Sequence, residues 1–315
     1  MRIGTSLAKM LMRAWPSRPD ADDPWARYDS ASDEEKRRIG LESSRFRHQY
    51  EQDICFFSKY FPGISPAELR GRSILDLGCF TGGRLVYWVE RYGFANARGI
   101  DVKDAYAQAG RNFAAERAVM AEFDTGFAEN LPYAAESFDY ITSYDVLEHV
   151  RSVEKAMREC HRVLKTGGKF LCVFPAFFQP LEAHLGMATG MPALHWIFPG
   201  KVLMQAYWEI LTERGPGADW YRPKTPELAE WERLPTLNGI TIRKFRRILK
   251  AQPGWRMLWW STAPILSDGR RAQQPIFRLL RWLFALPAKM PLLEELFLGR
   301  ICCVLEKVAK DTHSP

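Results

Sequence analysis

The stretch Ile74-Leu75-Asp76-Leu77-Gly78-Cys79-Phe80-Thr81-Gly82-Gly83 decides the fold of this chain. A short apolar run, 73–78, enters a glycine turn, and the stretch 83–92 that follows has the apolar spacing of a helix. Glycine lacks a Cβ, so such a turn lets a ligand approach the backbone closely. The helix that follows offers free N–H groups at its first turn. The stretch therefore predicts a strand, a ligand-binding turn and a helix.

The same alternation of strands and helices continues after this stretch. We expect further strands at 97–101, 120–124, 138–144 and 169–175, with helices at 105–119 and from Ser152 to Gly167. A helix at 241–252 and strands at 255–261 and 300–306 resume the pattern near the end of the chain. Strands that alternate with helices predict parallel βαβ units and a doubly wound α/β sheet.

Two interruptions of this rhythm suggest how the chain is organised. We expect a flexible or amphipathic lead-in at 1–42, a cofactor-binding α/β core at 43–175 and an aromatic-rich cap insertion at 176–240. The remainder of the core, 241–315, then holds a basic amphipathic insertion at 262–298. Within the lead-in, residues 1–15 have the pattern of a basic amphipathic helix, either a surface anchor or a transit peptide.

An acidic residue ends the second predicted strand. Asp101 lies 23 residues past Gly78, where a carboxylate can accept both hydrogen bonds of a ribose diol. The glycine spacing does not match the GxGxxG pattern of dinucleotide-binding turns. Asp76, two residues before Gly78, instead suits the cationic aminoacyl end of S-adenosylmethionine.

Four blocks of sequence resemble one known family. They are Ile74–Gly83; Gly99-Ile100-Asp101; Ala128–Tyr133 with Glu136–Asp139; and Asp145-Val146-Leu147-Glu148-His149 with Arg162–Lys169. In order and spacing, they resemble a class I S-adenosylmethionine-dependent methyltransferase of the methyltransferase type 11. The resemblance implies S-adenosylmethionine as cofactor and a seven-stranded sheet whose last strand, 300–306, is antiparallel.

The resemblance also implies roles for individual residues. In the first block, Asp76, Gly78 and Gly82 would frame the methionine part of the cofactor, and Cys79 and Phe80 are also expected to bind it. The other expected cofactor residues are Asp101 for the ribose, the neighbouring Val102, Phe127 and Ala128 for adenine, and Tyr144 and Asp145, which close the site. Two positions depart from the family pattern: Phe80 stands where glycine is usual, and Phe127 stands where an acidic residue is common.

Candidate catalytic residues follow the fourth strand. His149 is a candidate general base, because histidine as a residue type ordinarily titrates near neutral pH, and Glu148 precedes it. The alternative is that His149 has only a structural packing role. Asp145, Glu148 and His149 resemble a metal cluster of some O-methyltransferases, but we expect no metal. In the cap insertion, His184 and His195 could face an acceptor pocket, or could simply pack.

Composition and charge indicate which classes of partner the protein is expected to bind. The chain has 315 residues, is 47% apolar and carries a net charge of +7, which excludes a wholly disordered protein. Residues 241–290 hold eleven Lys and Arg and one acidic residue, which indicates an anionic neighbour or, as the alternative, a solvated surface. The apolar run 276–286 within this basic band is typical of a membrane-surface helix; the alternative is a packed helix. The six cysteines form no CxxC pair, which favours reduced thiols in the cytoplasm and no zinc site.

These observations predict an enzyme. We expect methyl transfer to a small or lipid- or glycan-linked acceptor, at oxygen, in the cytoplasm or peripherally at a membrane. The alternative is a non-catalytic protein of this fold that binds a membrane or a partner. RNA methylation ranks lower, and nucleic acid is not an expected partner, because no N-P-P-[YF] string follows the fourth strand.

Overall fold

A computed structural model describes residues 2–17, 24–181, 183–215, 228–264, 290 and 293–309 of the chain. The chain forms two compact units. The first, which we call the sheet unit, comprises 32–174, 245–261 and 301–315. The second, which we call the helical unit, comprises 1–31, 175–244 and 262–300. Both expected insertions and residues 1–31 of the lead-in therefore belong to the same unit, whereas residues 32–42 of the lead-in belong to the sheet unit.

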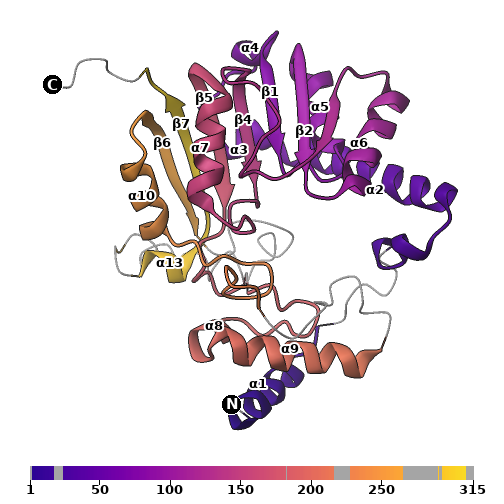
Figure 1. Ribbon diagram of the computed structural model, residues 1–315, viewed down its shortest axis with the longest axis vertical. Coiled ribbons are helices and arrows are strands. Elements are labelled where there is room, and N and C mark those ends of the chain that lie inside the picture. The colour runs from indigo at the N-terminus through magenta and orange to yellow at the C-terminus, as the bar shows by residue number, and fades with distance from the viewer. Residues whose placement is uncertain are drawn as a thin grey trace. The chain divides into compact units, whose positions relative to one another are not determined.

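The sheet has seven strands in the order β3-β2-β1-β4-β5-β7-β6 (Figure 1). Their bounds are β1 Ser73–Leu77, β2 Asn96–Asp101, β3 Glu122–Thr125, β4 Phe138–Tyr144, β5 Leu164–Phe174, β6 Trp255–Pro264 and β7 Leu298–Lys307. Pairing is parallel from β3 through β5, and β7 is antiparallel to β5, with Cys172 opposite Cys303. The predicted doubly wound sheet and its antiparallel last strand are confirmed.

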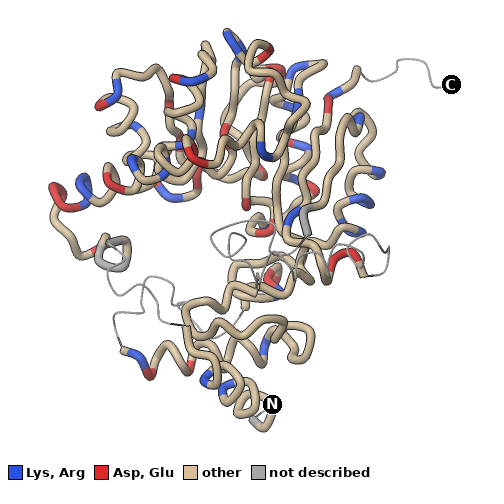
Figure 2. Tube along the Cα trace, turned by 180° about the vertical axis from the view of Figure 1, so that it is seen from behind, with Lys and Arg blue, Asp and Glu red and all other residues tan. Residues whose placement is uncertain are grey.

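Helices lie on both faces of this sheet. They are α2 Asp33–Ile54, α3 Phe56–Tyr60, α4 Pro66–Leu69, α5 Gly83–Tyr92, α6 Asp104–Arg117, α7 Val153–Val163 and α10 Ile242–Ala251. α2, α5 and α6 pack together, and α7 packs on β5 (Figure 1). The described part of the basic band includes α10, where Arg243, Arg246, Arg247 and Lys250 are exposed (Figure 2). The apolar run 276–286 lies outside the described residues.

Two element boundaries differ from expectation. α2 begins at Asp33, so helical structure starts well before the expected core boundary at residue 43. The Ser32 side chain accepts a hydrogen bond from the Glu35 N–H, and three acidic residues occupy the first turn, which favours a helix start there. α7 ends at Val163 rather than near Gly167, because Leu164 is extended and pairs with Phe138 of β4.

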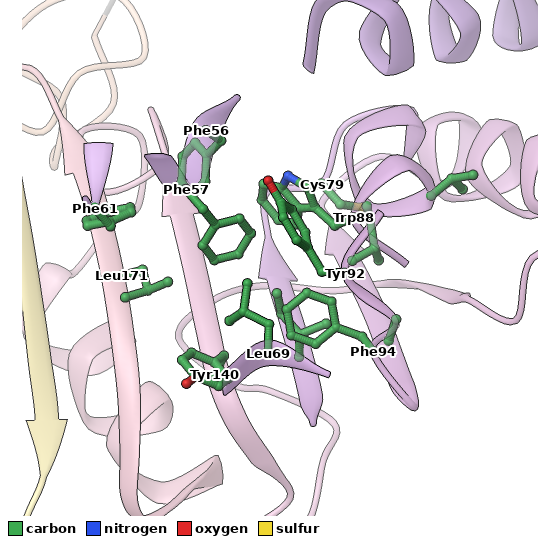
Figure 3. Packing of buried hydrophobic residues seen from close by; sticks show 14 of the residues in the cluster. Phe56, Phe57, Phe61, Leu69, Cys79, Trp88, Tyr92, Phe94, Tyr140 and Leu171 are labelled. Atoms are coloured by element: carbon green, nitrogen blue, oxygen red, sulfur yellow. The ribbon is translucent and has the colours of Figure 1, made fainter. Parts of the chain in front are cut away.

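Aromatic rings fill the space between α3, α5 and the sheet (Figure 3). The Phe56 and Phe57 rings lie 5.0 and 5.1 Å from the ring of Trp88, and Phe57 also contacts Tyr92. Trp88 is fully buried, and its indole N–H donates to the Glu51 carboxylate over 2.7 Å. This packing fixes the end of α2 beside the helix that follows the glycine turn.

The helical unit contains α1 Arg2–Ala14, the 3-10 helix η1 Pro24–Ser30, α8 Leu194–Ile197, α9 Gly200–Arg214 and α13 Glu294–Phe297. α1 packs on α9 and buries Ala8 and Met12 in the apolar core of the unit. The predicted amphipathic helix at the start of the chain is therefore present. Across the described parts of both units, we find no helix with the length and apolar content needed to cross a bilayer.

Candidate active site

The glycine turn lies at the carboxyl end of β1 and approaches its neighbours closely. Gly78 and Gly82 have φ angles of +69° and +74°, which favour glycine. A Cβ at Gly78 would lie 2.3 Å from Cγ2 of Val146, and one at Gly82 would lie 2.4 Å from the Phe123 ring. The backbone N–H groups of Gly78 and Cys79 both donate to the Ile100 carbonyl, over 2.8 and 3.1 Å. The turn is thus fastened to the end of β2.

Asp76 is completely buried beneath this turn, with its charge already paired. Its Oδ1 accepts hydrogen bonds from Arg84 Nη2 and from Thr142 Oγ1, both over 2.9 Å. Burial works against the charged guanidinium, but the Asp76 and Glu51 carboxylates outweigh it and raise the pKa of Arg84. The cation that Asp76 faces in this structure is Arg84, and the expected contact of Asp76 with the cationic end of the cofactor stays a prediction.

A second arginine reaches the same region from α2. The Arg47 guanidinium carbon lies 4.9 Å from the centre of the Phe80 ring, and that of Arg84 lies 5.4 Å from the Tyr144 ring. The surrounding protein and the charge of Arg84 both lower the pKa of Arg47. Sequence reasoning missed both arginines. The available signal was the position of Arg84 two residues past Gly82, whereas Arg47 gives none without the fold.

Asp101 stands at the carboxyl end of β2, half-buried, as expected. Its Oδ2 accepts from the Phe80 N–H over 2.9 Å, and its Oδ1 accepts from the Lys103 N–H over 3.4 Å. Phe80 has a φ of +51°, so it adopts the left-handed conformation that glycine would take there. Its ring packs on Tyr106, with the ring centres 4.3 Å apart. The bulk of Phe80 is thus accommodated without displacing Asp101.

Two apolar side chains are exposed beside Asp101. Val102 follows β2 and is 57% exposed, and Phe127 follows β3 and is 55% exposed. The Arg151 guanidinium carbon lies 5.9 Å from the centre of the Phe127 ring, and Ala128 is buried next to it. An exposed aromatic ring and an exposed aliphatic side chain beside a carboxylate suit a nucleoside, whose base is planar and whose ribose carries paired hydroxyls.

Cys79 is placed in the turn as expected, but its side chain points into the core. The thiol is buried close to Gly99. Burial, together with the Asp76 and Asp101 charges, raises the pKa of the Cys79 thiol well above its ordinary value. This residue therefore shapes the turn through its backbone rather than through its sulfur.

The segment after β4 brings together the remaining expected site residues of the sheet unit. The Tyr144 hydroxyl lies 3.2 Å from that of Tyr60, and the Asp145 N–H donates to the Val173 carbonyl over 2.9 Å. His149 Nε2 lies 3.9 Å from Oε1 of the buried Glu148, and the imidazole is 37% exposed. This pair sits at the carboxyl edge of the sheet, where α/β proteins bind ligands. No group of three or more His, Cys, Asp or Glu side chains with metal-binding geometry occurs among the residues that the structure describes.

His184 and His195 belong to the helical unit. His184 Nδ1 lies 3.1 Å from the Thr236 hydroxyl. His195 is buried against Phe177, with the ring centres 5.6 Å apart, and burial lowers its pKa to about 4. Its imidazole is therefore neutral near pH 7.

Comparisons with known proteins agree with this geometry. Residues 75–172 match the family described as methyltransferase domain. Ajmaline N-methyltransferase of Rauvolfia serpentina is 28% identical over 217 residues, covering 65% of this chain and 72% of the relative. Ubiquinone biosynthesis O-methyltransferase of Coxiella burnetii is 28% identical over 131 residues, covering 42% and 54%. The chain thus spans about half the length of the second relative.

A solved structure shares the fold. Geranyl diphosphate C-methyltransferase from Streptomyces coelicolor, in complex with Mg²⁺, geranyl diphosphate and S-adenosyl-L-homocysteine, aligns with a TM-score of 0.50. The alignment covers 82% of this chain and 77% of that one at 14% identity. The named relatives act at nitrogen and at oxygen, so the acceptor atom has to be argued from the site itself.

Proposed function

We propose that this chain, a class I S-adenosylmethionine-dependent methyltransferase with S-adenosylmethionine as its cofactor, transfers a methyl group to a hydroxyl oxygen of a small or lipid- or glycan-linked acceptor. The observation that carries the choice of oxygen is the His149–Glu148 pair at the carboxyl end of β4, with its nitrogen and oxygen 3.9 Å apart. A hydroxyl acceptor must lose a proton as it is methylated, and a histidine at this edge can take it.

The residues of the sheet unit fit the cofactor. We assign the ribose hydroxyls to Asp101 and the adenine ring to the exposed faces of Val102 and Phe127, with Ala128 behind. The carboxylate of the methionine part is assigned to Arg47 and Arg84, the two cations beside Phe80 and Tyr144. Asp76 then acts through Arg84, because it fixes the guanidinium from below with a 2.9 Å hydrogen bond. Gly78, Gly82 and Asp145 shape the backbone around these groups.

For methyl transfer to a hydroxyl, the protein mainly has to align the acceptor with the cofactor and provide a group that accepts the proton. The bound cofactor supplies a methyl group already activated by its positive sulfur. The chain has to hold the acceptor oxygen in line with that methyl and exclude water. The imidazole of His149 would take the hydroxyl proton while the new oxygen–carbon bond forms and the methyl–sulfur bond breaks, which leaves S-adenosylhomocysteine, and the buried Glu148 carboxylate would stabilise the imidazolium. A positioned base of this kind contributes roughly 10²–10⁴-fold to a rate.

The relatives suggest the acceptor class. One is named for an alkaloid and another for ubiquinone biosynthesis. We propose that His184 and His195 of the helical unit contact the acceptor. Support comes from the chain path: Phe177, which packs on His195, follows three residues after β5 ends. We place the reaction in the cytoplasm, an assignment supported by the six cysteines, none of which forms a disulfide in the described part of the chain.

The proposal is tested first by cofactor binding and then by turnover. S-adenosylhomocysteine should raise the melting temperature of the full chain, as any ligand of the native state does. Metabolite profiles of a knockout strain should then accumulate a species that lacks one methyl group, and the purified protein should methylate it. A protein that shows no thermal shift at millimolar S-adenosylhomocysteine cannot work in this way.

The His149→Gln variant tests the choice of oxygen. With the identified acceptor, we expect kcat to fall roughly 10²-fold or more, with the cofactor-induced thermal shift retained. The matched control is His161→Gln on α7, whose Nε2 lies 3.2 Å from the Gly254 carbonyl oxygen and which is not among the assigned site residues. We expect unchanged kcat for the control. A His149→Gln variant as fast as the wild type would remove the argument for a hydroxyl acceptor.

A further inference from the structure

We infer that α1 of the helical unit docks this protein onto an anionic lipid surface. The contact is made by Ile3, Leu7 and Met10, which we call the α1 stripe. This inference does not depend on the proposed reaction, because the α1 stripe shares no residue with the assigned cofactor and catalytic groups.

The way in which α1 is held on α9 turns the stripe outward. Ala8 and Met12 are fully buried in the core that includes α9 residues Leu203 and Met204. Two ion pairs fix the rotation of the helix: Lys9 Nζ lies 2.6 Å from Glu209 Oε2, and Arg13 Nη2 lies 2.6 Å from Glu213 Oε2. α1 therefore has one buried face and one side held by ion pairs. These contacts determine that the remaining side of the helix, which carries the α1 stripe, is exposed.

That remaining face is apolar. Ile3, Leu7 and Met10 recur at the spacing of one helical face, and they are 86%, 45% and 59% exposed. An apolar helix already packed by one side gains nothing for folding by carrying a second apolar side in water. Contiguous exposed apolar groups mark a contact surface.

Charge and aromatic content favour lipid as the partner. Lys9 and Arg13 are paired with Glu209 and Glu213, but α1 and α9 together carry five basic and two acidic residues, and this net charge of +3 complements an anionic surface. Trp15, at the end of α1, is 60% exposed, and tryptophan prefers the membrane–water interface. An amphipathic helix with this composition lies in the plane of the interface with its apolar face inserted.

Neighbouring apolar groups of the helical unit extend this surface. The Trp15 carbonyl accepts hydrogen bonds from Thr189 Oγ1 and from the Gly190 N–H, over 2.8 and 2.9 Å. These bonds tie the end of α1 to the segment that leads into α8. There, Trp196 and Ile197 are 43% and 68% exposed. Trp196 and Ile197 follow the segment that is bonded to Trp15. They therefore provide a second site at which the helical unit can insert into the lipid surface.

Vesicle co-sedimentation of the full chain tests the inference. Vesicles of phosphatidylglycerol and phosphatidylcholine should bind the wild type at low salt, and binding should weaken as salt is added. The Ile3→Glu/Leu7→Glu double variant should bind at least roughly tenfold more weakly, because it places two charges in the inserted face. The matched control is Met120→Glu, which adds a charge at a methionine that is 85% exposed on the sheet unit. It should bind like the wild type, and all three proteins should keep the thermal shift with S-adenosylhomocysteine.

Three results would overturn the inference. The first is a wild type that does not co-sediment at low salt. The second is a double variant that binds as well as the wild type while Arg278→Glu/Arg281→Glu does not, which would assign the contact to the basic segment outside the described residues. The third is a wild type that forms a dimer, lost in the double variant, without binding vesicles; the α1 stripe would then join two copies of the chain.

Discussion

Replacing Glu51 by Gln should make the protein more stable at alkaline pH. Glu51 is 1% exposed, and burial raises its pKa to about 7 from an ordinary 4.5, against the opposing effects of Arg84 and of its hydrogen bonds from Trp88 and Phe56. The folded chain therefore holds a proton on Glu51 at pH values where the unfolded chain has released it. Stability from this group is complete below pH 4.5 and is lost as the pH rises to 7.

The size of the effect follows from the same two pKa values. A difference between about 7 and 4.5, at about 1.4 kcal/mol per pKa unit, corresponds to about 3 kcal/mol of unfolding free energy above pH 7. Glutamine keeps the shape of the protonated acid and cannot ionise. The stability difference between Glu51→Gln and the wild type should therefore grow by about 2–3 kcal/mol between pH 5 and pH 8.

Urea unfolding at pH 5, 6, 7 and 8 measures this difference. Groups that titrate equally in both proteins cancel, so the pH dependence of the difference reports Glu51 alone. The control is Glu34→Gln, at an exposed carboxylate in the first turn of the same helix, whose effect should be nearly constant over this range. If the difference for Glu51→Gln were also constant from pH 5 to pH 8, Glu51 would not titrate there and the reasoning from burial would fail.

Three further predictions concern the site. Asp101→Ala should weaken S-adenosylhomocysteine binding, measured by calorimetry, by about 1.5–3 kcal/mol, roughly ten- to a hundredfold, because it removes hydrogen bonds to a charged group; an unchanged affinity would contradict the ribose assignment. Arg84→Met should destabilise the fold by about 3–5 kcal/mol in urea unfolding, because it leaves Asp76 buried without its cation. Arg91→Met, on the exposed side of α5, is its control and should change stability by less than about 1 kcal/mol. Methyl transfer should survive EDTA, because the activated methyl needs no Lewis acid; loss of activity that magnesium or zinc restores would show that Asp145, Glu148 and His149 bind a metal.

The sequence predicted those features that depend on neighbours along the chain. The alternation of apolar strands and helices gave the sheet, and the turn at 78–82 and the acidic end of β2 gave the place of the site. It did not predict contacts that depend on how the elements pack. The ion pair between Asp76 and Arg84 was missed because α5 has to pack back on β1 before the two side chains can meet. Arg47 lies on a helix whose start at Asp33 was itself missed, because its polar first turns show no apolar period.

The position of β7 has a consequence for the order in which the chain folds. β7 pairs with β5, although more than a hundred residues separate them in sequence, and β6 lies on its other side. As the chain leaves the ribosome, β1 to β5 can assemble early, but the backbone of β5 along Lys169–Phe174 then forms an open edge. Contacts between residues so far apart in sequence form slowly. Until β7 pairs with it, the unpaired apolar edge of β5 can pair with other chains. A chain that stops before Leu298 keeps that edge permanently, and its fate is aggregation rather than a smaller native protein.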